Sequence, residues 1–240
     1  MAENQRIDKV LANLGYGTRK EVKSIIKNGG VAIDGIAVYD SGTHVDPDRQ
    51  CISVNGERIN YKEFVYIMMN KPAGVISSTE DSMDKTVIDI LTPDYRVFNL
   101  SPIGRLDKDT VGLMLLTNDG DLTHRIISPK NHVPKVYYAK INGVVTSEDI
   151  QKFKEGVTLD DGYKTMPANL KIIESGDVST IELEIFEGKF HQVKRMFESV
   201  DKKVTYLMRL SIGPIGLDPS LSQGSFRELT YDELSILKTF

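Results

Sequence analysis

The chain has 240 residues, enough to bury a sizeable core and to form one large domain or two smaller ones. Its residues are 40% hydrophobic and 27% charged, as in ordinary globular proteins, and its net charge of −4 excludes a uniformly basic chain that binds polyanions by bulk charge. The apolar runs are too short to cross a bilayer, no secretion signal opens the sequence, and the single cysteine, Cys51, cannot form an internal disulfide, so we expect a cytoplasmic protein without a membrane partner.

Two short helices are predicted first. Apolar residues recur at helical spacing from Ile7 to Leu14, and Gly15-Tyr16-Gly17 ends this helix. Thr18 and Glu21 have the spacing of a capping box that begins a second helix. Because the apolar positions of this second helix face inward, its basic side chains lie on the outer face: Arg19, Lys20, Lys23 and Lys27.

Short strands follow these helices. Val31–Ile33 and Ile36–Val38 flank Asp34-Gly35, a dipeptide typical of a two-residue hairpin turn. A further strand is predicted from Cys51 to Val54. Paired helices with a basic face, followed by this hairpin, resemble the S4 RNA-binding domain, and the likeness extends from about Arg6 to Ile59.

We place the S4-like domain at residues 1–60. The resemblance implies RNA contacts from its exposed cations: Arg6, Arg19, Lys20 and Lys23. A basic-faced packing domain without a ligand is the alternative.

Residues 61–240 form the predicted second domain. Short strands with alternating or continuous apolar character begin at Phe64 and are interrupted by fewer helices. The candidate helices are Val87–Leu91, Leu122–Ile127, Ser147–Lys154, Gln192–Val200 and Tyr231–Lys238. Because strands and helices do not alternate regularly, a mixed, mainly antiparallel α+β fold is favoured over a doubly wound parallel sheet.

Basic residues gather in two stretches of the chain. Residues 1–30 carry six basic side chains against three acidic ones, and residues 188–209 carry six against two. Local basic patches steer a polyanion to a site, so the two stretches together favour RNA as the partner.

The most informative stretch runs from Gly104 to Gly120. Asp107 lies just before the apolar run Val111 to Leu116, and a strand there would hold its carboxylate rigidly at the rim of a cleft. Gly-Arg-Leu-Asp followed by Asp-Thr-x-Gly-Leu closely resembles the signature of pseudouridine synthases, which isomerise uridine within RNA. The resemblance implies that Asp107 is the catalytic carboxylate. It also implies that Arg105 lies near the flipped nucleotide, on a phosphate or in the vacated stack.

Pseudouridine formation breaks the C1′–N1 bond, turns the bound uracil and rejoins the ribose through C5. One ionised carboxylate suffices because the uracil leaves as a stabilised anion, whereas glycosidases usually need two. Asp107 would attack C1′ or remove a ribose proton, and the sequence leaves both routes open. We expect Asp109 to accept backbone hydrogen bonds in the turn, with a metal pair formed by Asp107 and Asp109 as the alternative. Without a Walker loop or a Cys/His cluster at metal spacing, no cofactor and no metal are expected.

Lys135-Val136-Tyr137 resembles the family's Lys-x-Tyr motif, whose tyrosine packs against the uracil. An aromatic ring suits an extruded base because stacking contributes roughly 1–3 kcal/mol per base. The resemblance therefore assigns Tyr137 to the uracil and Lys135 to RNA contact. A buried core tyrosine is the alternative, and Tyr138 should point to the opposite strand face.

The stretch from Glu187 to Phe197 resembles a family motif at the start of a helix, with a basic residue that pairs with the catalytic aspartate. Such a cation keeps a partly desolvated carboxylate ionised. Lys194 matches this position and Arg195 is the alternative; since adjacent helical residues do not share a face, the two divide between pairing and RNA contact. His191 and Gln192 are also expected to contact the RNA. A solvated basic helix is the alternative.

Asn70-Lys71-Pro72-Ala73-Gly74-Val75 resembles the opening motif of the same domain, and Lys71 is expected to contact a phosphate or to lie exposed. After an S4-like module, this motif points to the RsuA branch of the family. His191 to Met196 looks most like the small-subunit ribosomal-RNA members of that branch. The expected protein is a monomeric synthase of the uridine-516 type, acting on 16S ribosomal RNA within a partly assembled small subunit. A 23S enzyme and a non-catalytic RNA-binding assembly factor are the alternatives.

Overall fold

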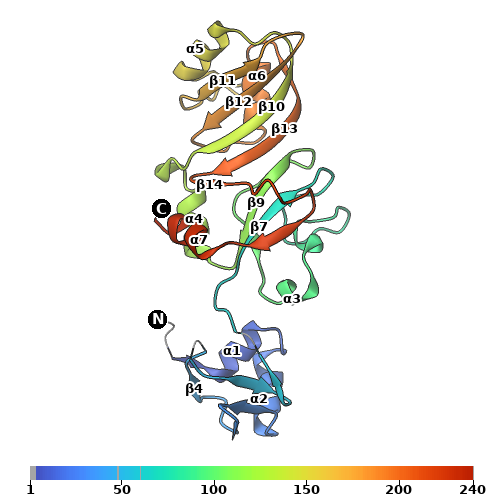
Figure 1. Cartoon of the computed structure of the whole chain (residues 1–240), viewed down its shortest axis with the longest axis vertical. Helices are drawn as coiled ribbons and strands as arrows, with labels where there is room; N and C mark the ends of the chain where they lie inside the picture. The colour runs from blue at the N-terminus through green and yellow to red at the C-terminus, as the bar shows by residue number, and fades with distance from the viewer. Residues whose placement is uncertain (1–3, 48, 60, 240) are drawn as a thin grey trace. The chain divides into compact units, whose positions relative to one another are not determined.

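The computed structural model describes residues 4–47, 49–59 and 61–239, and the chain divides into two compact units (Figure 1). The first unit extends to Val65 and also takes in Thr92–Asn99. The second unit holds Tyr66–Leu91 and the chain from Leu100 onward. The sequence does not signal that Thr92–Asn99 belongs with the first unit, and the domain boundary placed between residues 60 and 61 stays a prediction.

The first unit combines short helices with short strands. Its elements are β1 (Gln5–Arg6), α1 (Ile7–Asn13), α2 (Arg19–Lys27), β2 (Val31–Ile33), β3 (Ile36–Val38), β4 (His44–Val45), β5 (Ile52–Val54), β6 (Glu57–Arg58) and α3 (Pro93–Arg96). Apolar side chains from α1, α2 and the strands β2, β4 and β5 form one core. This core leaves the basic side of α2 exposed.

Local signals in the first unit are confirmed. The amide of Thr18 donates to the Glu21 carboxylate at 2.7 Å and the amide of Glu21 donates to the Thr18 hydroxyl at 3.4 Å, which is the predicted capping box. β2 and β3 pair antiparallel around Asp34 and Gly35, whose φ angles of 50° and 80° are those that a tight hairpin turn requires. The strand predicted from Cys51 begins at Ile52.

A nine-stranded sheet dominates the second unit. Its strands are β7 (Tyr66–Lys71), β8 (Ser101–Pro102), β9 (Val111–Thr117), β10 (Lys135–Asn142), β11 (Asn169–Glu174), β12 (Val178–Ile185), β13 (Lys203–Ile212), β14 (Ile215–Gly216) and β15 (Phe226–Glu228). The main path is β11-β12-β10-β13-β9-β7-β15, with β14 beside β13 and β8 beside β9. Among the described strands of this sheet only β9 and β13 pair in parallel, so the fold is α+β and mainly antiparallel, as predicted.

The helices of the second unit are η1 (Ile88–Ile90), α4 (Gly120–Ile127), η2 (Pro129–Asn131), α5 (Ser147–Glu155), α6 (Gln192–Glu198) and α7 (Tyr231–Leu237). Four of the five predicted helices exist, with ends shifted by one or two residues, and the fifth is only the 3₁₀ turn η1. None of the helices in the described part of the chain combines the length and the apolar character needed to cross a bilayer.

Strands β7 and β9 are buried along their whole length. A strand covered on both faces needs apolar residues at successive positions, which explains the continuous run Val111–Leu116. Figure 1 shows α4 and α7 near these strands, and both helices contribute to the core cluster that includes Met68 and Leu115. Strand β9 begins two residues after Asp109, so the polar loop that carries Asp107 and Asp109 lies at the edge of this core.

Candidate active site

The loop between β8 and β9 carries Asp107, and its backbone is fixed by neighbouring groups. The Ser77 hydroxyl donates to the carbonyl of Leu106 at 2.8 Å and accepts the amide of the same residue at 2.9 Å. The amide of Gly74 donates to the carbonyl of Lys108 at 2.7 Å. The Asp107 side chain, 27% exposed, is thus held by an ordered backbone yet remains open to a ligand.

Lys71, at the end of β7, supports the same loop from inside. Its side chain is fully buried, and Nζ donates to the carbonyl oxygens of Thr110 at 2.8 Å, Asp107 at 3.0 Å and Pro72 at 3.2 Å. Burial lowers the pKa of Lys71 from 10.5 to about 8, against the opposing charges of Asp109 and Asp107. The prediction of a phosphate contact or an exposed position for Lys71 is therefore wrong, because its ammonium group is engaged within the protein.

Helix α6 directs Lys194 toward this loop. Its Nζ lies 3.3 Å from Asp107 Oδ2 and 2.7 and 2.9 Å from the two carboxylate oxygens of Asp109. Burial acts to lower the pKa of Lys194, but the hydrogen bonds and charges of Asp109 and Asp107 raise it above its usual value. His191, just before the helix, places Nε2 3.5 Å from Asp107 Oδ1. The predicted proximity of Lys194 and Asp107 is present in the structure.

Asp109 forms the shorter of the two ion pairs of Lys194, and the hydrogen bond from Lys194 is the largest cause of the lowered pKa of Asp109. The carboxylate also accepts a hydrogen bond from its own backbone amide, in line with the acceptor role expected in the turn. The side chain of Asp109 is 72% exposed, so this ion pair lies at the solvent side of the site. Lys194 is therefore shared between two carboxylates, only one of which faces the cleft described next.

A cleft of about 700 Å³ is lined by Asp107 and by one face of the sheet. Lys135 and Tyr137 occupy alternate positions of β10 and so face the same side, and Arg209 lies directly opposite Tyr137 on β13. The sheet floor also carries apolar side chains: Ile185, Leu207 and Ile212. Tyr137, 8% exposed, lies in the same cleft as Asp107.

The rim of the cleft carries further groups that the sequence analysis assigned to RNA. Arg105 lines the cleft with an exposed side chain. His191 also lines it, and its ring stacks on that of Phe190 with 3.8 Å between centroids. Phe190 is 75% exposed. Aromatic and cationic groups therefore meet at the entrance.

Gln192 has a different place from the one predicted. It is 4% exposed, its amide nitrogen donates to Glu187 at 3.0 Å, and its oxygen accepts the amide of Lys189 at 2.8 Å. Glu187 in turn accepts the Tyr163 hydroxyl at 2.6 Å and the Met166 amide at 2.8 Å. The predicted RNA contact of Gln192 is therefore wrong, because its polar atoms order the segment before α6.

Arg195 likewise binds protein groups rather than facing the cleft. Its guanidinium pairs with Asp160 and Asp161, and its side chain is 13% exposed. Lys194 pairs with Asp107 while Arg195 pairs with two exposed carboxylates, so the predicted RNA contact of Arg195 stays a prediction.

In the first unit, the predicted cations of α2 are exposed. Arg19, Lys20 and Lys23 extend from one side of the helix. Arg6 forms a two-pronged pair with Asp8, at 3.1 Å from Nε and 2.9 Å from Nη2, and stays half exposed. The basic face of α2 is thus available to a polyanion.

Sequence reasoning missed Arg209 as a site residue. It is 2% exposed, Nε donates to the Leu113 carbonyl at 2.8 Å, and Nη2 lies 3.8 Å from the Met114 sulfur. The only sequence signal was an arginine inside the apolar strand from Val204 to Ile212, where it was counted as part of a basic stretch.

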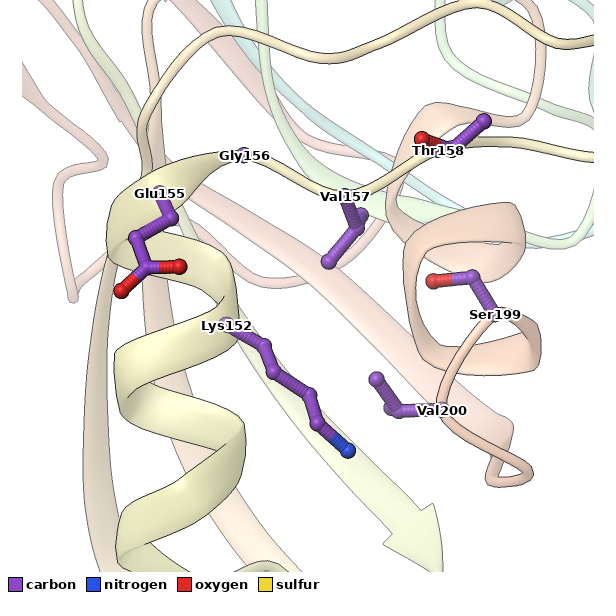
Figure 2. A pocket seen from close by; sticks show the side chains of 7 residues that line it. All are labelled: Lys152, Glu155, Gly156, Val157, Thr158, Ser199 and Val200. Atoms are coloured by element: carbon purple, nitrogen blue, oxygen red, sulfur yellow. The ribbon is translucent and has the colours of Figure 1, made fainter.

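A smaller hollow of about 330 Å³ lies where the C-terminal ends of α5 and α6 approach each other (Figure 2). Lys152 reaches across it toward Val200, while the Glu155 carboxylate points away. It shares no lining residue with the cleft at Asp107. We therefore assign the chemistry to the larger cleft.

Comparison with known proteins agrees with this geometry. A family model described as RNA pseudouridylate synthase matches residues 65–199, and one described as S4 domain matches residues 5–51. The uncharacterised RNA pseudouridine synthase YtzG of Bacillus subtilis is 53% identical over 234 residues, which cover 97% of this chain and 98% of that protein. The chain belongs to the RNA pseudouridine synthase family.

Two named relatives and a solved structure resemble this pseudouridine synthase over nearly its whole length. Ribosomal small subunit pseudouridine synthase A of Vibrio parahaemolyticus is 39% identical, covering 95% of this chain and 97% of that protein. Ribosomal large subunit pseudouridine synthase B of Bacillus subtilis is 37% identical, covering 98% and 96%. A crystal structure titled as a pseudouridylate synthase, 36% identical, has a TM-score of 0.68 and covers 97% and 99% of the two chains. The predicted S4-containing branch of the family is therefore confirmed.

The cleft of the pseudouridine synthase has the size and lining of a small-ligand site. Its volume lies in the ordinary range for small-ligand sites, and its floor combines apolar side chains with a tyrosine. Within residues 4–47, 49–59 and 61–239, no three His, Cys, Asp or Glu side chains are grouped so as to hold a metal ion.

Proposed function

We propose that this pseudouridine synthase isomerises one uridine of 16S ribosomal RNA, the uridine-516-type activity, within a partly assembled small subunit. Asp107 is the catalytic carboxylate, Tyr137 packs against the extruded uracil, and Lys194 pairs with Asp107. The observation that carries these roles is the 3.3 Å between Lys194 Nζ and Asp107 Oδ2, at a cleft that also contains Tyr137.

Asp107 acts on the ribose while the cleft retains the base. Attack on C1′ and removal of a ribose proton use the same carboxylate, and in both routes the uracil keeps the electron pair of the broken C1′–N1 bond. Since the uracil returns to the same sugar and no water enters the product, a second catalytic carboxylate is not needed. The ordered loop around Asp107 keeps the carboxylate at one position during both steps.

RNA is held by groups outside the reacting centre. Extruding the target base costs a few kcal/mol, which contacts to the flanking strand must offset. Arg105 is placed at the rim for a phosphate or for the vacated stack, and His191 lines the same rim. On the S4 domain, the exposed cations of α2 supply phosphate contacts, and half-exposed Arg6 adds another.

The small-subunit target is supported by two observations. The motif His191 to Met196 resembles that of small-subunit enzymes, and the relative at 39% identity is named for the small subunit. The relative at 37% identity is named for the large subunit, which makes 23S ribosomal RNA the second candidate. We also propose a cytoplasmic monomer, because the RNA-facing surface must stay open; light scattering tests the monomer.

Mapping of pseudouridine in ribosomal RNA from cells lacking the protein tests the target. We expect one 16S site to disappear, to return with the wild-type protein and to stay absent with Asp107→Asn. Loss of a 23S site alone would show that the substrate is large-subunit RNA. Normal modification by Asp107→Asn would refute the catalytic role of Asp107.

The assembly stage is tested with purified protein. Partly assembled small-subunit particles should be modified faster than isolated 16S RNA at equal concentration. Equal rates on the two substrates would argue against recognition of an assembly intermediate.

A further inference from the structure

Two cations stand on the otherwise apolar floor of the cleft. Lys135 on β10 and Arg209 on β13 share the sheet face of Tyr137, with Arg209 directly across from the tyrosine. The neighbouring floor positions are Ile185, Leu207 and Ile212. A uracil resting on Tyr137 would therefore have positive groups along its edge.

Neither cation has a carboxylate within ion-pair distance among residues 4–47, 49–59 and 61–239. Lys135 Nζ donates to the Val133 carbonyl at 2.8 Å, and Arg209 donates to the Leu113 carbonyl. Both acceptors are neutral. Arg209 is 2% exposed and Lys135 is partly buried, and a buried charge without a counter-charge is costly, so an anionic or strongly polar ligand on this floor would be stabilised.

Burial and the neighbouring charge act on Lys135 in the same direction. Desolvation, with a smaller contribution from the Arg209 guanidinium, lowers the pKa of Lys135 from 10.5 to about 8. The two positive charges both line this cleft. A negative charge developing there would be attracted by both.

We propose that Lys135 and Arg209 form the site for the uracil carbonyl oxygens and stabilise the uracil anion that forms during the reaction. This inference rests on the pseudouridine synthase activity and applies whether the target is 16S or 23S RNA. A backbone phosphate is the other anion that RNA offers. The apolar side chains and the tyrosine around the two cations fit a planar base rather than a phosphate, so the base is the occupant.

The step balances without a further reactant. When the C1′–N1 bond breaks, its electron pair stays on the uracil and spreads over N1, C5 and the two carbonyl oxygens. C5 then gives an electron pair to C1′, and the new bond forms. C5 afterwards loses its proton and N1 gains one, so the product is an isomer of the substrate. Donors at the carbonyl oxygens stabilise the anion between these two bond changes.

Lys135→Met tests the site in the full-length enzyme. We expect the single-turnover rate to fall about 100-fold, as when one donor to a developing oxyanion is removed, with unchanged RNA affinity. Lys135→Arg keeps the charge and should restore most of the rate. Lys140→Met is the matched control: it lies on the same strand, is exposed, and should react at the wild-type rate.

Arg209→Gln provides the second measurement, with the thermal unfolding midpoint as a check on folding because Arg209 is buried. A lower rate at unchanged affinity supports the inference. Unchanged rates for folded Lys135→Met and Arg209→Gln would overturn it. The inference would also be overturned if the variants lost only RNA affinity and the slope of log K against log salt fell by about one, because that change indicates a lost phosphate contact. Absence of pseudouridine formation by the wild-type enzyme on every ribosomal RNA would instead contradict the proposed function.

Discussion

Lys194 Nζ lies 3.3 Å from Oδ2 of Asp107, across the space between α6 and the loop before β9. The two side chains are 20% and 27% exposed, so their attraction is screened less than at an open surface. The next residue on the helix, Arg195, is held by Asp160 and Asp161 instead. Adjacent positions on the helix thus carry one cation that pairs with Asp107 and one that pairs with other carboxylates.

Lys194→Met should lower the single-turnover rate about 10- to 100-fold, because the carboxylate of Asp107 loses its positive neighbour in a partly desolvated site. Lys194→Arg should retain more activity than Lys194→Met. Arg195→Met is the comparison, since it removes a cation from the adjacent position and should change the rate far less. Equal losses in Lys194→Met and Arg195→Met would show that general charge, rather than the contact with Asp107, matters.

Joint replacement of Arg19, Lys20 and Lys23 by alanine should weaken RNA binding without lowering the rate at saturating RNA. These exposed side chains of α2 are expected to bind phosphates, and each lost contact reduces the slope of log K against log salt by about one. The control replaces exposed lysines of the second unit, Lys152, Lys154 and Lys171, with the same change of net charge. Fluorescence anisotropy across salt concentrations measures both. Equal slopes in the two triple variants would place RNA on another face.

The sequence predicts most of the fold because the signals are local. The capping box at Thr18, the Asp34-Gly35 turn and the apolar run of β9 each depend on neighbouring residues, and each is present. The assignment of Thr92–Asn99 to the first unit could not be predicted, because it depends on tertiary packing that no local sequence pattern encodes.

In the candidate site, too, the residues marked by a motif could be predicted and those placed by tertiary packing could not. Motifs locate Asp107, Tyr137 and Lys194; the structure places Asp107 and Tyr137 in one cleft and pairs Lys194 with Asp107. Periodicity and motif do not report which cations are engaged inside the protein. Lys71, for example, is bound to three carbonyl groups, and Arg209 enters the cleft from a strand whose apolar neighbours suggest only a core.

Lys71→Met should destabilise the protein near neutral pH, because the carbonyl groups of Asp107 and Thr110 lose a buried donor, at about 1–3 kcal/mol for each group left unpaired. Lys108→Met, an exposed neighbour, should unfold as the wild type does. Urea unfolding measures both. If Lys71→Met were as stable as Lys108→Met, the support of the Asp107 loop by Lys71 would be refuted.

The stability difference between wild type and Lys71→Met should also depend on pH. Burial lowers the pKa of Lys71 from 10.5 in the unfolded chain to about 8 in the folded protein. Between these values the unfolded chain binds more protons, so the contribution of Lys71 to the unfolding free energy rises with pH. At about 1.4 kcal/mol per pKa unit, the rise is at most about 3.5 kcal/mol. A difference that stays flat from pH 7.5 to 10.5 would mean that Lys71 is not buried as an ammonium group.

Gly112→Ala should disrupt the junction between β9 and β13. Gly112 has a φ of 101°, and a Cβ there would meet the carbonyl oxygen and amide nitrogen of Arg209 well inside van der Waals contact. Backbone strain of about 1–2 kcal/mol and a steric cost of about 1–3 kcal/mol add in the same direction. Because the clash falls on Arg209, the variant should lose catalytic rate as well as stability, even below its unfolding midpoint. Gly120→Ala, at a helical position where a Cβ meets no atom within 4 Å, is the control and should be as stable as the wild type or slightly more stable. Calorimetry and single-turnover assays at low temperature check the two effects, and a Gly112→Ala enzyme with wild-type stability and rate would contradict the close approach of these strands.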